Sequence, residues 1–489
     1  MKKIKYNIKS TVVFFVLLGV FTSCSDDFVD VASEDENSED FFNSEEDYQS
    51  ALIGAYDLLQ STYLNVMLGE IASDNTLAGG ESATDVPGIQ EIDDMVHTPV
   101  NAQLRDIWSW MYAGVNRANY IMEFQDKTDF AGKEEVIGQT RFLRAYYYFE
   151  LVKWFGDVPL AIDKRILFGE ETNFDRSPKE DVYVLIEEDL QFAANNLPIT
   201  QAETGRITQG AARALLGKVY LYQDKFTEAA NVLDQVVSGP YDLVTDYESI
   251  FEQEGENNIE SVFEVQYTDE EGAGFGCLQC SEGNVAVGFN GIRNYSGPQF
   301  ESGFSFNVPT QEVVDTFEAG DIRLDVAILD IEAWAASQGA TFSTGFEHTG
   351  YFNRKYIARQ GDLNTGDANL TNPNNYRAIR FADVLLMAAE AHNRKSASND
   401  GQALIYLNRV RTRAELPDVT VTGTALLDAI YQERRVELVG EGHHFFDLVR
   451  TGRAATEIDG FVVGKHELFP IPLIEIQLAG DRWEQNPGY

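Results

Sequence analysis

Residues 210–238 read GAARALLGKVYLYQDKFTEAANVLDQVVS and carry the clearest helix-pair pattern in the chain. The positions that keep the offsets of a tetratricopeptide unit are Leu216, Gly217, Tyr220, Ala229 and Leu233. In such a unit a small residue lets two helices approach, and larger side chains fill the contact between them. A strict period of about 34 residues is not visible, and any antiparallel helix pair is the alternative interpretation. The stretch therefore predicts helical pairs of tetratricopeptide type rather than a regular solenoid.

Similar periodicity extends outward from this pair in both directions. Ser44 is a plausible helix cap, followed by an acidic first turn and an apolar face that continues to Leu59. Further helix-length periodic stretches are 106–124, 134–155, 181–197 and, as a looser pair, 381–413. We expect the tryptophans of these stripes, Trp108, Trp110 and Trp154, to lie in the core.

The character of the sequence changes between residues 268 and 376, where glycine, asparagine and aromatic residues crowd together. Short strand-like pieces occur at 262–267 and 285–289, and a helix is expected at 311–317. The fold predicted is mainly α: a tetratricopeptide-like helical-pair scaffold, 41–267 and 377–489, that carries an irregular, loop-rich lobe containing short strands. We call residues 268–376 the lobe. Binding residues tend to lie on loops that a rigid scaffold supports.

The N-terminus has the pattern of an export signal. Four lysines precede the apolar run 11–21, and Cys24 then opens an acidic stretch. Eleven apolar residues are too few to span a bilayer, which needs about 20 in a helix. We therefore expect 1–23 to be a lipoprotein signal peptide, Cys24 to be lipidated, and 24–40 to be an acidic tether. Ordinary secretion is the alternative, because the residues before Cys24 depart from the commoner lipobox.

Charge and cysteine content exclude several classes of protein. The 489-residue chain carries a formal charge of -42, which argues against nucleic acid as a partner, since nucleic-acid binding draws on clusters of lysine and arginine. Cys277 and Cys280 form a single CxxC among glycines, without the second pair that a zinc site requires. A local disulfide is expected, with two free thiols as the alternative.

Eight stretches in this order resemble the SusD/RagB family, which are glycan-binding outer-membrane lipoproteins of Bacteroidota. They are RFLRAYYYF (141–149), FGDVPL (155–160), RFADVLLMAAEA (380–391), ERRVEL (433–438), EG (441–442), FDLVR (446–450), LFPIP (468–472) and QNPGY (485–489). One departure is His443-His444, where family members often carry an arginine. The resemblance runs nearly from end to end.

The resemblance implies a function and a place in the cell. Such proteins are lipid-anchored at the outer surface of the outer membrane, capture oligosaccharide or polysaccharide, and deliver it to a SusC-like TonB-dependent transporter. The chain is then not an enzyme and needs no cofactor, and the acidic surface favours a neutral, glucan-like sugar. A peptide- or protein-binding surface scaffold is the alternative, and a glycoside hydrolase is the third.

The family places its sugar site on the loop after the first helix and on the irregular lobe, which here are residues 73–94 and 289–356. Neutral sugars stack on aromatic rings and bond to Asn, Asp and Arg side chains. The expected glycan-binding residues are Trp334, Tyr295, Asp74, Asn75, Phe289, Arg293, Tyr351 and Arg354. Each aromatic could instead pack inside the lobe.

Three further clusters have both a chemical and a structural interpretation. Asp362, Asn364 and Asp367 offer oxygen ligands for calcium, but without the glutamate of an EF-hand loop, so turn chemistry is favoured. His443-His444 is a poor chelating pair, and we expect hydrogen-bonded structural histidines. The acidic series Glu433, Glu437 and Glu441 lies on one helix face, and it is expected to pair with Arg409, Arg411 or Arg413 in an ion-pair network.

Overall fold

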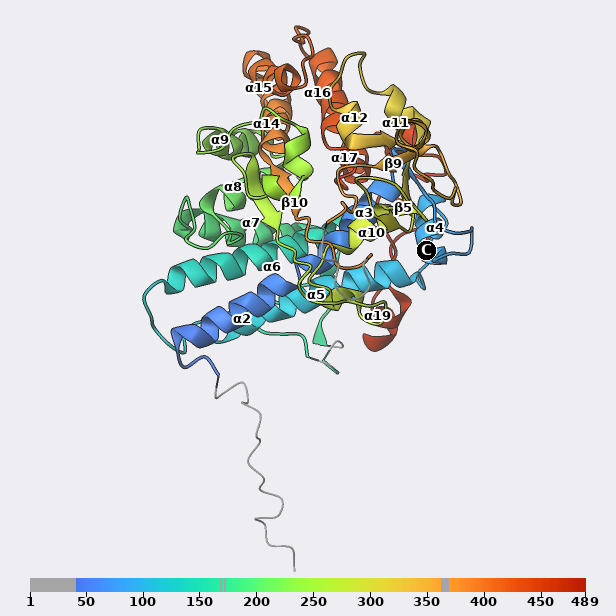
Figure 1. The fold of residues 1–489 in the computed structure, drawn as a ribbon. Coiled ribbons are helices and arrows are strands. Elements are labelled where there is room, and N and C mark those ends of the chain that lie inside the picture. The colour runs from blue at the N-terminus through green and yellow to red at the C-terminus, as the bar shows by residue number, and fades with distance from the viewer. Residues whose placement is uncertain (1–40, 168, 171–172, 362–368) are drawn as a thin grey trace, which may run out of the picture.

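The computed structural model describes residues 41–167, 169–170, 173–361 and 369–489, and it confirms a mainly α fold (Figure 1). Cys24, the tether, and the calcium candidates Asp362, Asn364 and Asp367 lie outside these residues. The longer helices are α2 (Glu45–Asp57), α3 (Tyr63–Ile71), α4 (Pro87–Asp93), α5 (Ala102–Glu123), α6 (Lys133–Phe155), α7 (Lys179–Asn196), α8 (Gln209–Leu221), α9 (Phe226–Val237), α13 (Ile331–Gln338), α14 (Phe381–Arg394), α15 (Asp400–Arg413), α16 (Thr424–Glu437) and α17 (His444–Arg450). Shorter helices are α10 (Val285–Asn290), α11 (Gln311–Asp315), α12 (Leu324–Ala327), α18 (Ala454–Glu457) and α19 (Leu473–Leu478).

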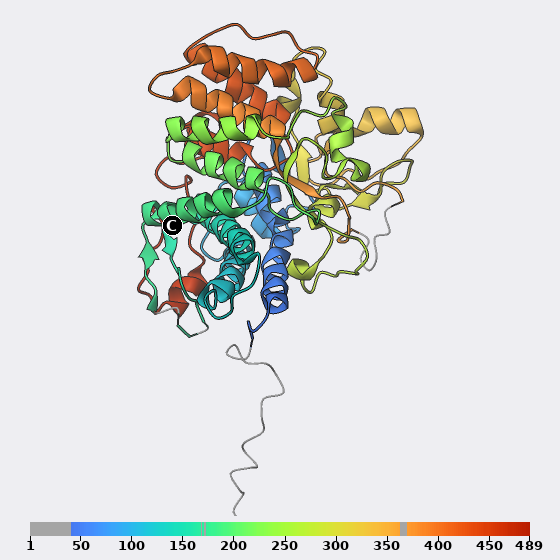
Figure 2. The same cartoon turned by 90° about the vertical axis from the view of Figure 1, so that its left-hand side faces the viewer.

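The helices stack side by side in one column. Neighbours in the column are α2, α5, α6, α7, α8, α9, α14 and α15, and α16 packs on α14. Figure 2 shows this column from α2 upward through green α8 and α9 to orange α14 and α15, with the lobe beside it. The chain leaves the column after α9, builds the lobe, and returns to it at α14. The lobe is thus inserted between two consecutive helical pairs.

The predicted pair at 210–238 is α8 and α9, and its small residue acts as expected. A Cβ placed on Gly217 would lie only 2.4 Å from Cδ2 of Leu233 on the facing helix. Any larger side chain would therefore push the two helices apart. Asp224 takes a positive φ of 57° in the turn between them. The looser pair at 381–413 is confirmed as α14 and α15, which also lie in contact.

The N-terminal cap and the core tryptophans also agree with the sequence. Ser44 and Asp47 form a reciprocal capping box at the start of α2. Trp108, Trp110 and Trp154 are all buried. Their indoles lie among aromatic side chains such as Phe155, which packs edge-on against Trp108.

A set of buried charges, which we call the ion-pair network, joins the lobe to the scaffold. Its members are Glu260, Arg323, Lys355, Arg380, Arg411, Arg413, Glu433, Glu437 and Glu441. Glu437 is its centre, since it accepts from Arg323 and Arg380 at 2.9 Å each and from Arg413 at 2.5 Å. The expected partners Arg411 and Arg413 are confirmed, whereas Arg409 pairs with Asp242 at 2.9 Å. The network explains how three glutamates on one face of the chain are tolerated.

The strands are short and pair two by two. They are β1 (Thr76–Ala78), β2 (Val158–Pro159), β3 (Arg176–Ser177), β4 (Ser261–Val265), β5 (Ile292–Arg293), β6 (Ser302–Gly303), β7 (Asn307–Pro309), β8 (Ile328–Asp330), β9 (Tyr351–Asn353) and β10 (Tyr376–Arg380). The antiparallel pairs are β1 with β7, β2 with β3, β4 with β10, and β8 with β9, whereas β5 and β6 run parallel. The pairing of β4 with β10 closes the base of the lobe, so its loops start from a fixed frame.

Two details of the lobe differ from, or complete, the sequence analysis. The strand expected at 285–289 is wrong, because Val285–Asn290 forms helix α10, which Asn284 caps through a bond from the N–H of Ala286 (3.1 Å). The apolar run is buried on all sides, so its periodicity could not separate helix from strand. Cys277 and Cys280 form a disulfide in an exposed loop.

Candidate functional site

Two segments of the lobe run side by side and form a surface strip, residues 293–296 with 341–343. Ser296 and Thr341 exchange two backbone hydrogen bonds, of 2.8 and 2.9 Å, and the N–H of Ser343 donates to the carbonyl of Arg293 at 2.9 Å. Successive side chains of such an extended segment are about 3.3 Å apart along it. Arg293 and Tyr295 are two residues apart, so the side chains that contact them lie next to each other along the strip.

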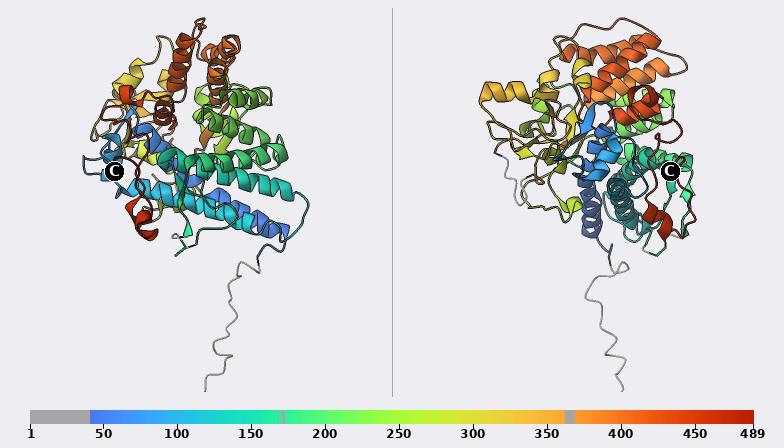
Figure 3. Two further views of the ribbon diagram at one scale, coloured as in Figure 1. Left: turned by 180° about the vertical axis from the view of Figure 1, so that it is seen from behind. Right: turned by 90° about the vertical axis from the view of Figure 1, so that its right-hand side faces the viewer.

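Trp334 lies at one end of the strip and is held in a fixed position. Its indole N–H donates to the hydroxyl of Tyr295 at 2.9 Å, and that hydroxyl donates to the carbonyl of Pro298 at 2.7 Å. The ring of Phe300 packs against the indole at 5.2 Å. Trp334 is half-buried on α13, the gold helix that projects from the lobe in Figure 2 and in the right-hand view of Figure 3. An indole that is fixed at one edge and partly exposed can serve as a stacking platform.

Arg293 lies at the other end, where three segments meet. Its guanidinium donates to the carbonyl of Phe304 at 2.7 Å and lies 3.5 Å from the carboxylate of Asp85. Asp85 belongs to the loop after the first helices, and the N–H of Phe346 donates to Gly80 of the same loop at 2.9 Å. Arg293 and Asp85 remain 17% and 30% exposed, so both can still bond a ligand hydroxyl.

Aromatic rings extend this surface beyond Arg293. Phe275, in the disulfide loop, is 58% exposed, and its ring lies 5.6 Å from that of half-buried Phe304. Phe289, a predicted contact residue, lies beneath them and is 7% exposed, so it supports Phe304 rather than facing solvent. Sequence reasoning missed Phe275, Phe304 and Asp85. The isolated ring in Gly274-Phe275-Gly276 was the one available clue.

Asp74 and Asn75 are placed elsewhere. Asp74 accepts from Arg435 at 2.5 Å and contacts His444 at 3.0 Å, and Asn75, which is fully buried, accepts from Arg435 at 2.8 Å. Burial opposes ionisation of Asp74, but His444 and Arg435 outweigh it and lower its pKa. These residues fasten the loop before β1 to α16 and α17. His444 is thus a hydrogen-bonded structural histidine, as expected.

Tyr351 and Arg354 also lie away from the strip. On β9, Phe352 packs in the cluster that contains Tyr295, so its neighbour Tyr351 points to the opposite face, where its hydroxyl bonds Gln311 at 2.8 Å. Arg354 bonds Glu248 at 2.5 Å. The structure therefore brings together Trp334, Tyr295, Arg293 and Phe289, and separates them from the other four predicted residues. Tyr295 is 8% exposed, so like Phe289 it packs inside the lobe and supports its neighbour rather than facing solvent.

Each lysine and arginine of the lobe lies beside a carboxylate. Arg323 and Lys355 are buried in the ion-pair network, and Arg359 bonds Glu252 at 2.7 Å. With Arg293 and Arg354 also facing carboxylates, each of these positive charges is balanced locally. The strip is therefore better suited to a neutral ligand than to a sulfated or uronate chain.

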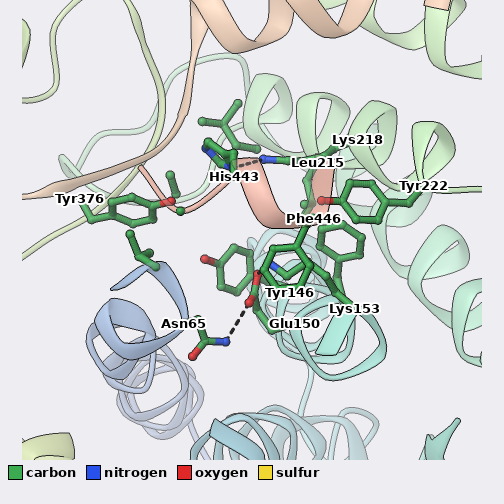
Figure 4. A pocket seen from close by; sticks show the side chains of 15 residues that line it. Asn65, Tyr146, Glu150, Lys153, Leu215, Lys218, Tyr222, Tyr376, His443 and Phe446 are labelled. Atoms are coloured by element: carbon green, nitrogen blue, oxygen red, sulfur yellow. Dashed lines mark hydrogen bonds and ion pairs between the residues drawn. The ribbon is translucent and has the colours of Figure 1, made fainter. Parts of the chain in front are cut away.

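A small cavity between α3, α6, α8 and α17 holds a second polar cluster (Figure 4). Glu150 accepts from Asn65 at 2.8 Å and from Lys153 at 2.7 Å, and Lys218 bonds Nδ1 of His443 at 3.2 Å. Burial lowers the pKa of His443 to about 3, so the ring is neutral and structural. The cavity has a volume of about 30 Å³. It can hold one or two waters but not a sugar ring.

The described residues contain neither a cluster of metal-ligating side chains nor a helix that could span a membrane. No group of three or more His, Cys, Asp or Glu side chains in them is arranged to hold a metal ion. Nor does any of their helices combine the length and apolar character needed to cross a membrane.

Comparison with known proteins identifies relatives along most of the chain. A model of the SusD family matches residues 247–489, and a second model, described as starch-binding associating with outer membrane, matches 27–221. SusD-like protein P2 of Formosa agariphila is 28% identical over 98% of this chain and all of its own. The solved structure of a laminarin-binding SusD-like protein has 36% identity and a TM-score of 0.84, covering 92% of this chain and all of the other.

A ligand-bound structure is among the similar ones. Surface glycan-binding protein A from Bacteroides thetaiotaomicron in complex with laminarihexaose has 29% identity and a TM-score of 0.81, covering 90% of this chain and 99% of the other. Near-complete coverage at 36% identity, together with the two family models, leaves one assignment: this chain belongs to the SusD family of glycan-binding proteins.

Proposed function

We propose that this chain captures a neutral, laminarin-type glucan on the strip between Trp334 and Arg293. The observation that supports this proposal most directly is the position of the Trp334 indole. Its N–H donates to the hydroxyl of Tyr295 at 2.9 Å, while part of the ring remains exposed. A rigid, partly exposed ring can stack on a sugar without first being ordered, so little conformational entropy is lost on binding. Two similar solved proteins are described by their laminarin or laminarihexaose ligands, which supports the same sugar class here.

The open form of the strip suits a polymer. An enclosed pocket can admit only the end of a chain, whereas a polysaccharide must lie across an accessible surface. Trp334 at one end and Arg293, Asp85 and Phe275 at the other provide alternating stacking and hydrogen-bonding positions. Asp74, Asn75, Tyr351 and Arg354 would then affect binding only through the shape of the lobe.

The test is calorimetric titration of the purified protein with laminarihexaose and with a sulfated hexasaccharide as the matched control. We expect saturable binding of the neutral sugar and none of the sulfated one, because Arg293 is already balanced by Asp85. Incubation with laminarin should release no new reducing ends, since the proposed role is capture and not hydrolysis. Binding of the sulfated sugar alone, or release of product, would reject the proposal.

The proposal includes a lipid anchor and a transporter. Cys24 would carry the acyl chains, the acidic residues 24–40 would act as a tether, and the folded part would deliver glycan to a SusC-like TonB-dependent transporter. Labelled palmitate should be incorporated into the wild type and not into Cys24→Ala. A transporter barrel should co-purify from outer membranes in mild detergent. Equal membrane partitioning of Cys24→Ala, or no retained barrel, would argue against these two parts.

A further inference from the structure

Two adjoining hollows lie beside α2 and β4, and none of their lining residues belongs to the strip. One, of about 350 Å³, lies between α2, the loop 204–206 and residues 264–266. The other, of about 220 Å³, continues along β4, and both are lined by Thr204, Gly205, Arg206 and Glu264. Ligand pockets in proteins typically have volumes of about 300 to 1,000 Å³, so this double hollow is large enough for a small oligosaccharide.

Arg206 lines both hollows and keeps part of its side chain exposed. Its Nε donates to Glu203 at 2.9 Å, and its guanidinium lies 5.4 Å from the ring centre of Tyr56. Its side chain remains 17% exposed, and a guanidinium carries five N–H donors, so those that Glu203 and Tyr56 do not use can donate to a ligand in either hollow. Because a guanidinium donates but does not accept, a ligand that supplies oxygen acceptors to its exposed N–H groups gains affinity.

The surrounding charges restrict what that ligand can be. Asp57, Glu203, Glu264 and Glu282 line the hollows, and Arg206 is the one basic side chain among the described residues that do so. An anion would be repelled by the carboxylates, and a cation could not accept from Arg206. A neutral molecule rich in hydroxyl groups meets both conditions.

The other walls of the larger hollow fit a sugar ring, which has apolar C–H faces and polar hydroxyl edges. Ile53 is 57% exposed and, with Tyr56, provides an apolar wall for pyranose C–H groups. Opposite them, the amide of Gln266 is held by Asn257 through two hydrogen bonds of 3.0 and 3.1 Å. This fixed amide pair presents a preorganised polar edge.

We propose that the Arg206 hollow is a second binding site for neutral oligosaccharide, separate from the strip. The proposal rests on the proposed function for the class of sugar. A chain with two sites would hold a long glucan at two points and release it more slowly than either site alone. The disulfide loop connects the two sites: Gln60 of the hollow bonds the carbonyls of Gln266 and Glu282 at its ends (3.2 and 3.3 Å), and Phe275 within it packs against Phe304, whose carbonyl accepts from Arg293.

Hydrogen exchange with laminarihexaose as the probe tests the two sites separately. We expect slower exchange at residues 200–206 and at 293–298 in the wild type. In the double variant Trp334→Ala with Arg293→Ala, protection at 200–206 should persist. Thr204→Trp fills the hollow from an exposed position and should abolish that protection, as should Arg206→Ala. Thr420→Trp, exposed in the loop after α15, is the matched control and should change neither.

The possible outcomes separate a failure of the second site from a failure of the proposed function. Protection at 293–298 without protection at 200–206 would overturn the second site and leave the proposed function intact. Protection at 200–206 that survives Thr204→Trp and Arg206→Ala would also overturn it. Loss of protection at both regions in the wild type would reject both proposals. Native mass spectrometry should show two hexasaccharides per chain, falling to one in Thr204→Trp, and a single equivalent in the wild type would contradict the second site.

Discussion

The ion-pair network and the surface strip both place arginines beside carboxylates, but they differ in how completely those groups are used. In the network, Arg380 bonds Glu260, Glu437 and Glu441 and is almost fully buried. In the strip, Arg293 has a single carboxylate at 3.5 Å and keeps part of its side chain in solvent. Groups that are fully paired inside the protein stabilise it, whereas groups left partly unpaired remain available to a ligand.

The same contrast applies to the aromatic residues. Trp154 is fully buried between Phe446 and Phe469, which pack against it at 5.0 and 4.7 Å. Among the described residues, the indole of Trp334 has one ring neighbour, Phe300, and one hydrogen bond, to Tyr295. If the strip is the binding site, as proposed, stability and recognition depend on different parts of the chain, and substitutions should affect one or the other.

The largest effect is expected from Glu437→Ala in the network. It leaves Arg323, Arg380 and Arg413 without their shared carboxylate, and uncompensated buried charge typically costs about 3 to 5 kcal/mol of the free energy of unfolding. Denaturant unfolding measures the loss. Glu332→Ala, at a carboxylate that is 72% exposed, is the control and should change stability by less than about 0.5 kcal/mol. Equal stability of both variants would remove the distinction between network and surface.

Trp334→Ala should separate binding from stability. Loss of the stacking ring is expected to weaken laminarihexaose binding by about 1 to 3 kcal/mol, which corresponds to about ten- to a hundredfold in Kd. Calorimetry gives the affinity, and thermal unfolding checks the fold. A core tryptophan truncated to alanine costs about 3 to 5 kcal/mol of stability. A loss of stability of that size with unchanged Kd would reassign Trp334 to the lobe core and leave Phe275, which is 58% exposed, as the next platform to test.

A buried carboxylate at the end of α4 should make stability depend on pH. Asp93 accepts from the N–H of Ala78 at 2.7 Å, and burial raises its pKa to about 7. The folded chain then holds a proton between about pH 4 and 7 that the unfolded chain does not, so stability from this group falls as pH rises through that range. Asp93→Asn keeps an acceptor and should be more stable than wild type at pH 8 by about 1.4 kcal/mol for each unit of the shift.

Denaturant unfolding at pH 5 and pH 8 measures this difference, which should be smaller at pH 5. A variant whose advantage does not change with pH would show that Asp93 is not protonated in the folded protein.

At lower pH the ion-pair network has the opposite effect: it makes the folded protein less stable as pH falls. Burial raises the pKa of Glu437, but Arg413, Arg380 and Arg323 outweigh it and hold the pKa below its usual range, so its contribution is present above about pH 4.5 and is lost below.

The smallest effect is expected from Phe275→Ala at the rim of the strip. The ring is 58% exposed and touches Phe304 on one side, so stability should change by less than about 0.5 kcal/mol. Affinity for laminarihexaose should fall about twofold, which is about 0.4 kcal/mol. Titration of Phe275→Ala beside Trp334→Ala ranks the two rings. A larger loss in Phe275→Ala would move the centre of the site from α13 to the disulfide loop.

Much of the scaffold could be predicted from the sequence because its contacts are local. Gly217 and Leu233 lie on consecutive helices, so their offset already implied the close approach that the structure contains. The same holds for the capping box of Ser44 and for Arg411 and Arg413, which reach the glutamates of the following helix. The strand predicted at 285–289 was wrong because an apolar run that is buried on every side has no hydrophobic period that distinguishes a helix from a strand.

The site was only partly predictable, because exposure depends on partners that are distant in sequence. The sequence by itself determined the family, the helical pairs, the net negative charge and the set of aromatic residues from which a sugar platform could be drawn. The tertiary structure decided which of these face solvent: Arg435 and His444, some 360 to 370 residues away, bury Asp74, whereas Tyr295, 39 residues away, fixes Trp334 at the surface. The sequence specifies the chemistry of each side chain, but whether that side chain is buried or paired depends on segments that are remote in the chain and meet only in the folded protein.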